Sequence, residues 1–495
     1  MAKPVLQLLE NSNSLTSAPS GSHSSSLKKT LGPISLWGLG VGYVISGMYF
    51  GWNLGLPEGG PFGLLAATLL VTVMYVTFVL SYAELSCAIP RAGGAFAYTN
   101  RAFGPRLGFL GGVSQCIEFV FAPPAIAAAI GAYFHLFLPG VPALTIGAGA
   151  YLLFTALNIY GVRQSAAFEL FITVIAVFEL LLFAGIAVPH FTWTAFAQNP
   201  LPHGWSGIFP AIPYAIWFYL AIEGIANVAE ETKNPQKDLA RGFGSAMITL
   251  IILALVTFFS SVGIQGWEAV VYAPGTTAPS DSPLPMALGH VVGTGTVYYH
   301  LLITIGVCGL LASFHGIILV AGRATLEFGR IGYAPKILGT TLETRQTPAA
   351  ALLLNMGVGM IALFTGKTAE IITISVFGAL TMYVISLLAL FKLRKSEPEL
   401  VRPFKTPLYP WVPTLSLLLA VLSLVAMTVY NFRLAVIYVG MLGVAYAWFF
   451  IAVRAVRGVR EVRSTPPLSA MTLANSTSST SALQTVTHPP LQERG

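Results

Sequence analysis

Residues 34–56 read ISLWGLGVGYVISGMYFGWNLGL, an apolar and uncharged stretch that is long enough to cross a lipid bilayer. Glycine at its centre raises the entropic cost of ordering the backbone, so Ile45-Ser46-Gly47-Met48 is a poor place for an unbroken helix. Freed backbone groups are tolerated inside a membrane only where protein or a water-filled cavity meets them. We therefore expect a break near Ser46 and Gly47 that lines a site. The alternative is that the glycines only allow close helix packing.

Composition places the whole chain among polytopic membrane proteins. Of its 495 residues, 55% are hydrophobic and only 9% are charged, and the mean hydropathy is +0.74. Soluble globular domains do not have this composition. The expected fold is all-α, with twelve transmembrane helices of about the length that a bilayer requires. These spans cover residues 34–56, 63–85, 107–136, 143–159, 167–188, 208–228, 244–265, 297–322, 349–366, 369–393, 411–430 and 433–454.

The positive net charge is explained by where the basic residues lie. With the N-terminus in the cytoplasm, all but two of the 26 Lys and Arg fall on the cytoplasmic side, the exceptions being Lys367 and Arg433. This asymmetry is the positive-inside pattern, and it requires no nucleic acid partner. It predicts a multi-pass protein of the plasma membrane (the bacterial inner membrane) with both termini cytoplasmic.

The chain is expected to contain one membrane domain, residues 31–463. Residues 1–30 and 464–495 are rich in Ser, Thr or Pro and are predicted to be disordered cytoplasmic tails, without a cleavable signal peptide. The three cysteines form no metal-binding spacing and imply no disulfide. We expect no enzymatic activity, no catalytic residue, no metal site and no cofactor.

Acidic residues mark the interior of several spans. Glu118, Glu179 and Glu223 each lie deep in an apolar run, where an acid is treated as functional by default because burying its charge is expensive. The alternative for Glu118 and Glu179 is a structural acid satisfied within the helix bundle. Glu169 lies near the cytoplasmic end of its span, and we expect it to reach water.

A second break is predicted in the sixth span. Polar Glu223, Gly224 and Asn227 interrupt an apolar helix there, and Trp217 and Tyr219 come just before the interruption. Breaks in the first and sixth spans are typical of transporters built from two inverted halves of five helices, whose substrate site lies at the breaks. The halves would cover about residues 31–190 and 205–395, with two accessory helices over about residues 409–455.

Several segments resemble one transporter superfamily. Residues 82–85 read YAEL, 89–98 read IPRAGGAFAY and 102–105 read AFGP, which resembles the second-to-third span signature of the amino acid–polyamine–organocation superfamily. Five further stretches resemble its ethanolamine permeases: ISGMYFGWN (45–53), EFVFAPP (118–124), FELL (178–181), AIWFYLAIEG (215–224) and ASFHG (312–316). The resemblance covers about residues 28–455. It implies a leucine-transporter-like fold of 5+5 inverted repeats and transport by alternating access.

The resemblance and the breaks together define the candidate site. The expected substrate-binding residues are Ile45, Ser46, Gly47, Met48, Tyr49, Glu118, Trp217, Tyr219, Ala221 and Glu223. The expected coupling or gating residues are Glu179, Glu223, Ser313 and His315. His315 is either a titrating group or a neutral hydrogen-bonding histidine. The coupling ion is left open between a proton and sodium.

The residues at the first break bear on the substrate. Amino acid carriers of this superfamily usually show Gly-Ser-Gly there, and Ile45 stands in place of the first glycine. A β-branched residue resists the backbone nest that a carboxylate needs, whereas the buried acids favour a cation. We expect import of ethanolamine, a small hydroxylated amine. The alternative is an amino acid or polyamine transporter or exchanger on the same fold.

Two other classes of protein are weighed against a transporter. Residues 204–207 read GWSG, which matches a serine-protease motif by letter, but no partner histidine is placed at membrane depth. A channel would need filter loops or charged rings, which the sequence does not suggest. The expected partners are a small amine and the lipid bilayer, and the oligomeric state is left open.

Overall fold

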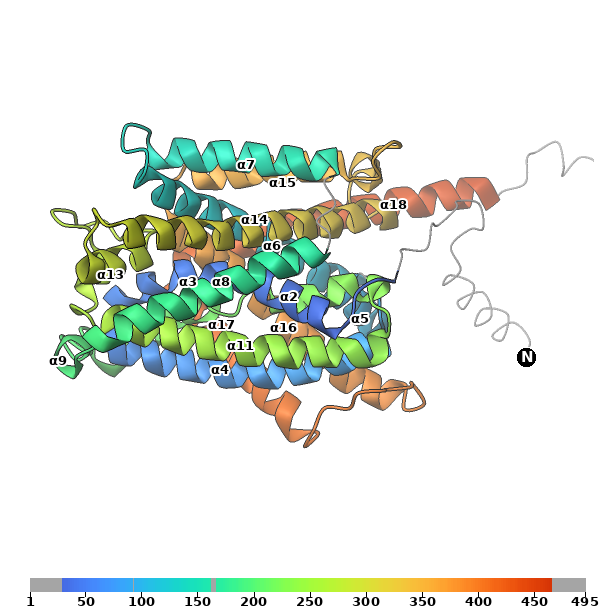
Figure 1. The fold of residues 1–495 in the computed structure, drawn as a ribbon. Helices are drawn as coiled ribbons and strands as arrows, with labels where there is room; N and C mark the ends of the chain where they lie inside the picture. Colours follow the sequence, from blue (N-terminus) through green and yellow to red (C-terminus); the bar gives the residue numbers. More distant parts are fainter. Residues whose placement is uncertain (1–28, 92, 162–165, 465–495) are drawn as a thin grey trace, which may run out of the picture.

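The computed structural model describes residues 29–91, 93–161 and 166–464, so most of both predicted tails lies outside the described residues. The regular elements of the described chain are helices, and only two isolated β-bridges are present there. Long helices lie side by side, as expected for a protein that crosses a membrane many times (Figure 1). The predicted all-α class is confirmed.

Ten helical spans of the described chain are each long and apolar enough to cross a bilayer. Nine of them contain one long helix each, namely α4 (Leu56–Ala88), α6 (Pro105–His135), α7 (Ala143–Tyr160), α8 (Ala166–Ala187), α11 (Pro235–Val262), α14 (Val297–Ile331), α16 (Thr368–Ser396), α17 (Trp411–Tyr430) and α18 (Phe432–Ser464). The tenth is interrupted and consists mainly of α10 (Ile208–Trp217) and η5 (Ile222–Glu231).

The remaining two predicted spans are also helical but shorter or broken. The first span consists of α2 (Pro33–Val44), α3 (Ser46–Tyr49) and η2 (Trp52–Gly55), and the ninth is the short helix α15 (Ala349–Leu363). A further surface helix, α5 (Gly94–Phe103), forms where the sequence predicts one after the second span. The structure therefore has a helix at every predicted span.

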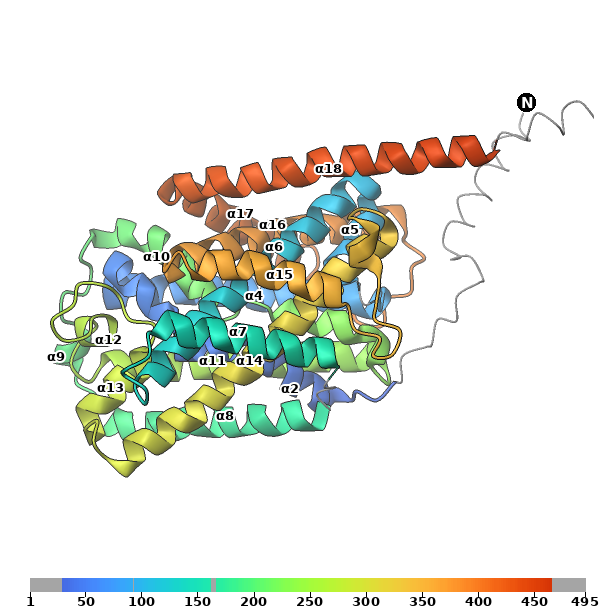
Figure 2. The same ribbon diagram turned by 90° about the horizontal axis from the view of Figure 1, so that it is seen from above.

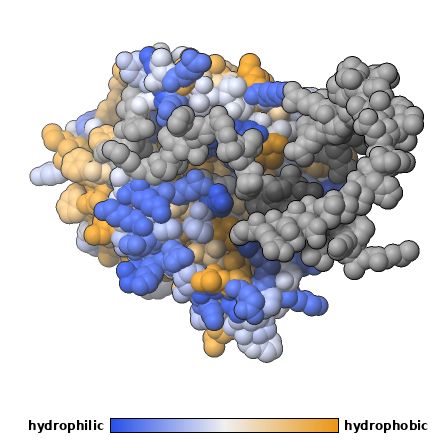
Figure 3. Space-filling model, turned by 90° about the vertical axis from the view of Figure 1, so that its right-hand side faces the viewer, coloured by the Kyte–Doolittle hydropathy of each residue, from blue (hydrophilic) through white to orange (hydrophobic). Residues whose placement is uncertain are grey.

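The bundle has two distinct ends. The start of α2 and the end of α18 lie at the same end, on the right of Figures 1 and 2, which we call the termini end. The short helices α9 (Trp193–Phe196), α12 (Glu268–Val271) and α13 (Pro283–Val292) lie at the opposite end. Hydrophilic residues cover much of the visible termini end, with hydrophobic residues at its edges (Figure 3).

Burial separates a central group of helices from a peripheral one. Of the most apolar part of α6 and of α16, 78% is buried, against 22% for α18 and 33% for α17. Apolar side chains exposed on a membrane-spanning helix face lipid rather than water. The last two helices therefore lie at the edge of the bundle, as expected for accessory helices.

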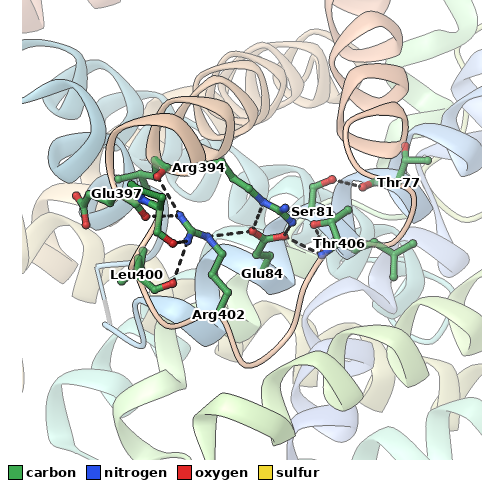
Figure 4. A network of polar contacts seen from close by, with 11 residues as sticks. Thr77, Ser81, Glu84, Arg394, Glu397, Leu400, Arg402 and Thr406 are labelled. Atoms are coloured by element: carbon green, nitrogen blue, oxygen red, sulfur yellow. Dashed lines mark hydrogen bonds and ion pairs between the residues drawn. The ribbon is translucent and has the colours of Figure 1, made fainter.

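Glu84, near the termini end of α4, is a fully buried acid with a complete set of partners (Figure 4). It accepts hydrogen bonds from Arg394 Nε at 2.7 Å, from Arg394 Nη2 at 2.6 Å and from the Thr406 amide at 2.7 Å. Arg402 Nε lies 3.3 Å from Glu84 Oε1, the oxygen that also accepts from Arg394 Nε. This cluster ties α4 to α16 and to the segment that follows α16.

Candidate functional site

The first span is broken, although not at the predicted residues. Ser46 and Gly47 stay helical within α3, and Ile45 is a turn residue that keeps helical dihedrals (φ −59°, ψ −24°). The backbone leaves the helix at Phe50, which is extended, and at Gly51, whose φ is +89°. Only glycine adopts such a φ without strain, which places the break one turn later than the sequence suggested.

The glycines on either side of this break have different roles. A side chain on Gly38 would meet Leu170, and one on Gly42 would meet Glu169 and Thr173, all on α8. The packing alternative is therefore right for these two glycines. The expectation that the first span is broken is confirmed, and the break occurs at Gly51 rather than at Ser46 and Gly47.

The sixth span is broken as predicted, with the break centred before Glu223. Helix α10 ends at Trp217, Ala221 has a φ of +78°, and a 3₁₀ helix that contains Glu223 and Gly224 follows. A left-handed conformation at a residue with a Cβ costs roughly 1–3 kcal/mol and persists where surrounding structure enforces it. Alanine carries no sequence signal for this conformation, so the position of the break could not be predicted.

The two breaks meet and enclose a cavity. A Cβ on Gly47 would collide with the backbone carbonyl of Trp217, and the Phe50 and Trp217 rings pack edge to face at 5.5 Å. We call this small space the central cavity. Its lining residues are Tyr43, Val44, Ser46, Ala122, Trp217, Leu220, Ala221 and Ile317. Ser46, Trp217 and Ala221 are among the predicted substrate-binding residues.

Ser313 connects α14 to the first break. Its hydroxyl lies 2.8 Å from the Tyr43 carbonyl oxygen and 2.8 Å from Ser46 Oγ. Ile45 and Met48 are fully buried but do not line the cavity. The structure therefore brings Ser313 and Ser46 together.

Two buried acids lie next to each other beside this cavity. Glu118 of α6 lies one helical turn from Ala122, and its carboxyl group lies near that of Glu223. Glu223 Oε2 accepts a hydrogen bond from Tyr383 at 2.9 Å, whereas Glu223 Oε1 and both Glu118 oxygens have no hydrogen-bond partner of good geometry among the described residues. Two buried carboxylates near each other resist being ionised together, so we expect the pair to hold a proton or a cation.

Tyrosine hydroxyls extend this acid pair toward α4. Tyr383 lies 3.0 Å from Tyr75, oxygen to oxygen, and the Tyr75 ring lies 5.3 Å from that of Tyr219. The Tyr219 hydroxyl pairs with Thr72 at 2.7 Å, so this predicted binding residue points toward α4. Sequence reasoning missed Tyr75 and Tyr383. Their only signal is a polar hydroxyl within an apolar span.

Glu179 forms a separate site from the acid pair. Tyr49 donates its hydroxyl hydrogen bond to Glu179 Oε2 at 2.7 Å and lies 3.2 Å from the Ala176 carbonyl. Tyr133 in turn donates to the Tyr49 carbonyl at 2.8 Å. Glu179 and Ala176 therefore lie on one helix face, as their spacing of three residues predicts.

The structure also shows where Glu169 and His315 lie. Glu169 is only 1% exposed, and within the described ranges neither of its carboxylate oxygens has a hydrogen-bond partner, so the expectation that it reaches water is wrong. It is buried because α8 packs on the glycine face of α2 at this level. His315 lies 3.1 Å from Asn158 of α7 and outside the lining of the central cavity.

The other candidate chemistries find no matching geometry in the described chain. Ser206 is exposed, and its hydroxyl donates to the carbonyl of His203 in the same turn rather than to an imidazole. Within the described ranges, no group of three or more His, Cys, Asp or Glu is placed to hold a metal ion.

Comparisons with known proteins show that this chain is similar to amino acid permeases and other transporters. The amino acid permease family model matches residues 31–454. An uncharacterized transporter of Rhizobium meliloti is 28% identical over 411 residues, covering 79% of this chain and 85% of its own. A branched-chain amino acid permease of Bacillus subtilis is 27% identical over 433 residues, covering 82% and 89%. A methylthioribose transporter of the same organism is 26% identical over 421 residues, covering 80% and 87%.

A solved structure shares the fold. The crystal structure of a manganese transporter mutant of Eremococcus coleocola covers 89% of this chain and 97% of its own, with a TM-score of 0.54 and 15% sequence identity. At this identity the likeness shows a common fold alone.

Proposed function

The chain belongs to the amino acid permease family of the amino acid–polyamine–organocation superfamily, and on that premise we propose that this transporter imports ethanolamine by alternating access. The observation that carries the proposal is the pair Glu118 and Glu223 beside the central cavity. No Lys or Arg of the described chain forms an ion pair with either residue, so the pair lacks a fixed positive charge. The ammonium group of a small amine would supply it.

The walls of the central cavity suit the rest of such a molecule. Trp217 offers an aromatic ring to a cation, and its buried indole N–H has no acceptor among the residues that the structure describes. A substrate hydroxyl can accept that hydrogen bond. The hydroxyl of Ser46 offers a further polar contact. A short molecule with an ammonium group at one end and a hydroxyl at the other matches these groups.

The backbone of the first break is less suited to a carboxylate. The Ile45 amide donates to the Val41 carbonyl, and the Met48 amide donates to the Ile45 carbonyl. These donors are therefore engaged, rather than gathered into an anion-binding nest. The alternative substrate class, an amino acid, is supported by the branched-chain amino acid permease among the relatives.

We assign coupling to groups that lie at the two breaks. Glu223 sits in the broken sixth span, and Ser313 joins α14 to the first break. Glu179 bonds Tyr49 of α3 and so joins α8 to the same region. The coupling ion is a proton or sodium. His315 remains a predicted coupling residue, although it pairs with Asn158 and does not line the central cavity.

The termini end of the bundle is proposed to face the cytoplasm. Both ends of the described chain lie there (Figure 1), and the Lys and Arg asymmetry of the sequence favours that orientation. The proposed location is the plasma membrane of a bacterium, with ethanolamine and lipid as partners. Reporter fusions after α18 should be cytoplasmic, and an external reporter would refute this topology.

The test of function is uptake of labelled ethanolamine by proteoliposomes containing the full chain. Proton and sodium gradients are imposed separately, and leucine and putrescine are added as competitors. We expect saturable uptake driven by one gradient and inhibited weakly by both competitors. Uptake of leucine in place of ethanolamine would establish the amino acid alternative. No gradient-driven uptake of any of the three compounds would overturn the proposal.

A further inference from the structure

Glu169, in the first turn of α8, is a buried acid to which the proposed function gives no role. Helix α8 begins at the termini end of the bundle and runs to the opposite end, where α9 follows it (Figures 1 and 2). Glu169 therefore lies on the side that is proposed to face the cytoplasm. We propose that Glu169 makes transport sensitive to cytoplasmic pH, because α2 packs on α8 only while this acid holds a proton.

Glu169 has no positive charge beside it that would let it stay ionised where it is. It is 1% exposed, and among the described residues it forms no ion pair and neither of its oxygens has a hydrogen-bond partner. An isolated ionised carboxylate is so costly to bury that the group takes up a proton instead. The carboxyl group also packs directly on the main chain of α2, because a Cβ on Gly42 would come within 2.7 Å of Glu169 Oε1. A proton is the cation that fits there without further space.

The titratable groups that face Glu169 from other helices do not supply that charge. Tyr43 of α2 interacts electrostatically with Glu169 and also with Arg323 of α14. Arg323 pairs with Glu231 of η5 at 3.0 Å, and His315 of α14 is bonded to α7 instead. Helix α13, which also contacts α8, lies at the opposite end. Other charged residues of α11 and α14 toward the termini end form no hydrogen bond or ion pair with Glu169 in the part of the chain that the structure describes; they are Lys237, Asp238, Arg241, Glu327 and Arg330.

The helix that covers Glu169 belongs to the broken first span. Helix α2 meets α8 through Gly38 and Gly42, and Thr173 of α8 donates a hydrogen bond to the Gly38 carbonyl at 3.1 Å. The break at Gly51 separates α2 and α3 from η2 and α4, and alternating access moves one group of helices against another around such breaks. When α2 leaves α8, cytoplasmic water reaches Glu169, its O–H bond breaks and the proton passes to a water molecule. The carboxylate that remains opposes the return of α2 until it takes a proton back from the cytoplasm.

The direction of the pH effect follows from this proton exchange. The packed state binds one more proton than the open state, so the ratio of open to packed molecules rises by up to about tenfold for each unit by which the cytoplasmic pH rises. Import requires α2 to return after each release of substrate, so a high cytoplasmic pH should slow transport. Glu169 releases and regains its proton on the same side of the membrane. Its effect is therefore separate from that of the ion that drives transport.

The test measures how accessible the interface between α2 and α8 is at each pH, and it needs no substrate. Thr173→Cys places a thiol in that interface, where Thr173 is fully buried, in a full chain whose three native cysteines are replaced by alanine. A membrane-impermeant maleimide is applied to this protein in lipid nanodiscs. The labelling rate should rise with pH more steeply with Glu169 than with Glu169→Gln, by up to about tenfold per unit. The rise that comes from ionisation of the thiol is common to both and cancels in their ratio.

Two further variants control for a general effect of substitution. Glu169→Asp keeps a carboxyl group that binds a proton, so it should keep the steeper rise. Glu343→Gln changes an exposed acid in the loop between η6 and α15. It removes one negative charge from the same side of the protein and should also keep the steeper rise.

Failure of this inference differs from failure of the proposed function. Equal labelling with Glu169 and with Glu169→Gln at every pH would overturn the inference, as would labelling that falls when the pH rises. A second check rests on the proposed function and its orientation: in proteoliposomes, Glu169→Gln should keep its ethanolamine uptake at an internal pH that slows the wild type. Absent ethanolamine uptake together with the steeper labelling would refute the proposed substrate and support the role of Glu169. Normal ethanolamine uptake together with equal labelling would refute the role of Glu169 and leave the proposed function standing.

Discussion

Glu84 and Glu118 are both fully buried glutamates on membrane helices, yet the protein treats them in opposite ways. Glu84 is surrounded by Arg394, Arg402 and a backbone amide (Figure 4). The Glu118 carboxyl group has no hydrogen-bond partner of good geometry in the described part of the chain, and it lies near a second acid, Glu223. The difference teaches that burial alone does not mark an acid as functional in such a protein. The presence or absence of a built-in cation distinguishes the two.

The Glu84 cluster contains its own arginines, so we expect it to support the structure. On the proposed function, the acid pair of Glu118 and Glu223 is complete only when a substrate or a proton brings a positive charge. The predictions below test whether this division between the Glu84 cluster and the acid pair holds, in order of decreasing effect.

Glu84→Gln should destabilise the protein strongly, by about 3–5 kcal/mol, because it leaves two arginines without their counter-charge. The measurement is thermal unfolding of the purified protein, together with its folded yield. Glu397→Gln is the matched control, because Glu397 pairs with Arg101 at the surface and such pairs contribute at most about 1 kcal/mol. Equal melting temperatures for Glu84→Gln and Glu397→Gln would mean that the Glu84 cluster stabilises the protein no more than a surface ion pair does. Glu84 would then no longer stand as a structural acid in contrast to the acid pair.

Gly47→Val should abolish uptake while leaving membrane insertion intact. The new side chain would collide with the Trp217 carbonyl and push the two breaks apart, without changing any charge. Gly149→Val is the control, because a Cβ at Gly149 of α7 would meet nothing within 4 Å. Normal uptake by Gly47→Val would mean that the contact between the breaks is not needed for transport.

Glu223→Gln should lower ethanolamine uptake at least tenfold, about 1.4 kcal/mol, and leave the melting temperature nearly unchanged. Glutamine keeps an oxygen for the Tyr383 hydroxyl but cannot carry charge. Uptake is measured over a range of pH in parallel with thermal unfolding. Full uptake at every pH, or a loss of stability like that of Glu84→Gln, would place Glu223 with the structural acids.

Glu118→Gln and Glu223→Gln should not be additive. If the two carboxyl groups hold one positive charge between them, removing either disrupts the same site, and the double variant should transport about as slowly as the slower single one. Uptake rates of the two single variants and the double variant form the cycle. Strict additivity would show that the two acids act independently.

The smallest effect concerns Asp281, an acid outside the spans. Burial raises its pKa to about 6, and the Thr368 hydroxyl that bonds it at 2.8 Å opposes part of that rise. The folded protein then binds more protons than the unfolded one between about pH 4 and 6, so its stability falls as pH rises through that range. Asp281→Asn should lack this fall when melting temperatures are compared across the range. An unchanged pH profile would refute it.

Most of the fold could be predicted from the sequence, because hydrophobic length and charge placement are local signals. The spans, the surface helix α5 and the presence of both breaks follow from them. The position of the breaks could not be predicted. It depends on Gly51 and Ala221, which both have a positive φ, and Gly51 lies against Trp217 and Ile372 of spans far away in sequence.

The site could be predicted only in part. The acids were visible as charges in apolar runs, but the sequence does not say which acid meets a cation. Glu169 illustrates this, because its burial depends on the packing of α8 against the glycines of α2. Tyr383 was missed for the same reason, since its role depends on reaching Glu223 from another helix.

The contact between Gly47 and the Trp217 carbonyl also limits how this transporter could be redesigned. The wall facing the first break is the main chain of the sixth span, which side-chain substitutions cannot reshape. Grafting residues 45–51 from a permease of different selectivity would bring a segment fitted to another backbone. A working chimera should therefore exchange residues 45–51 and 217–223 as one unit, and libraries that vary either segment alone should yield few active clones.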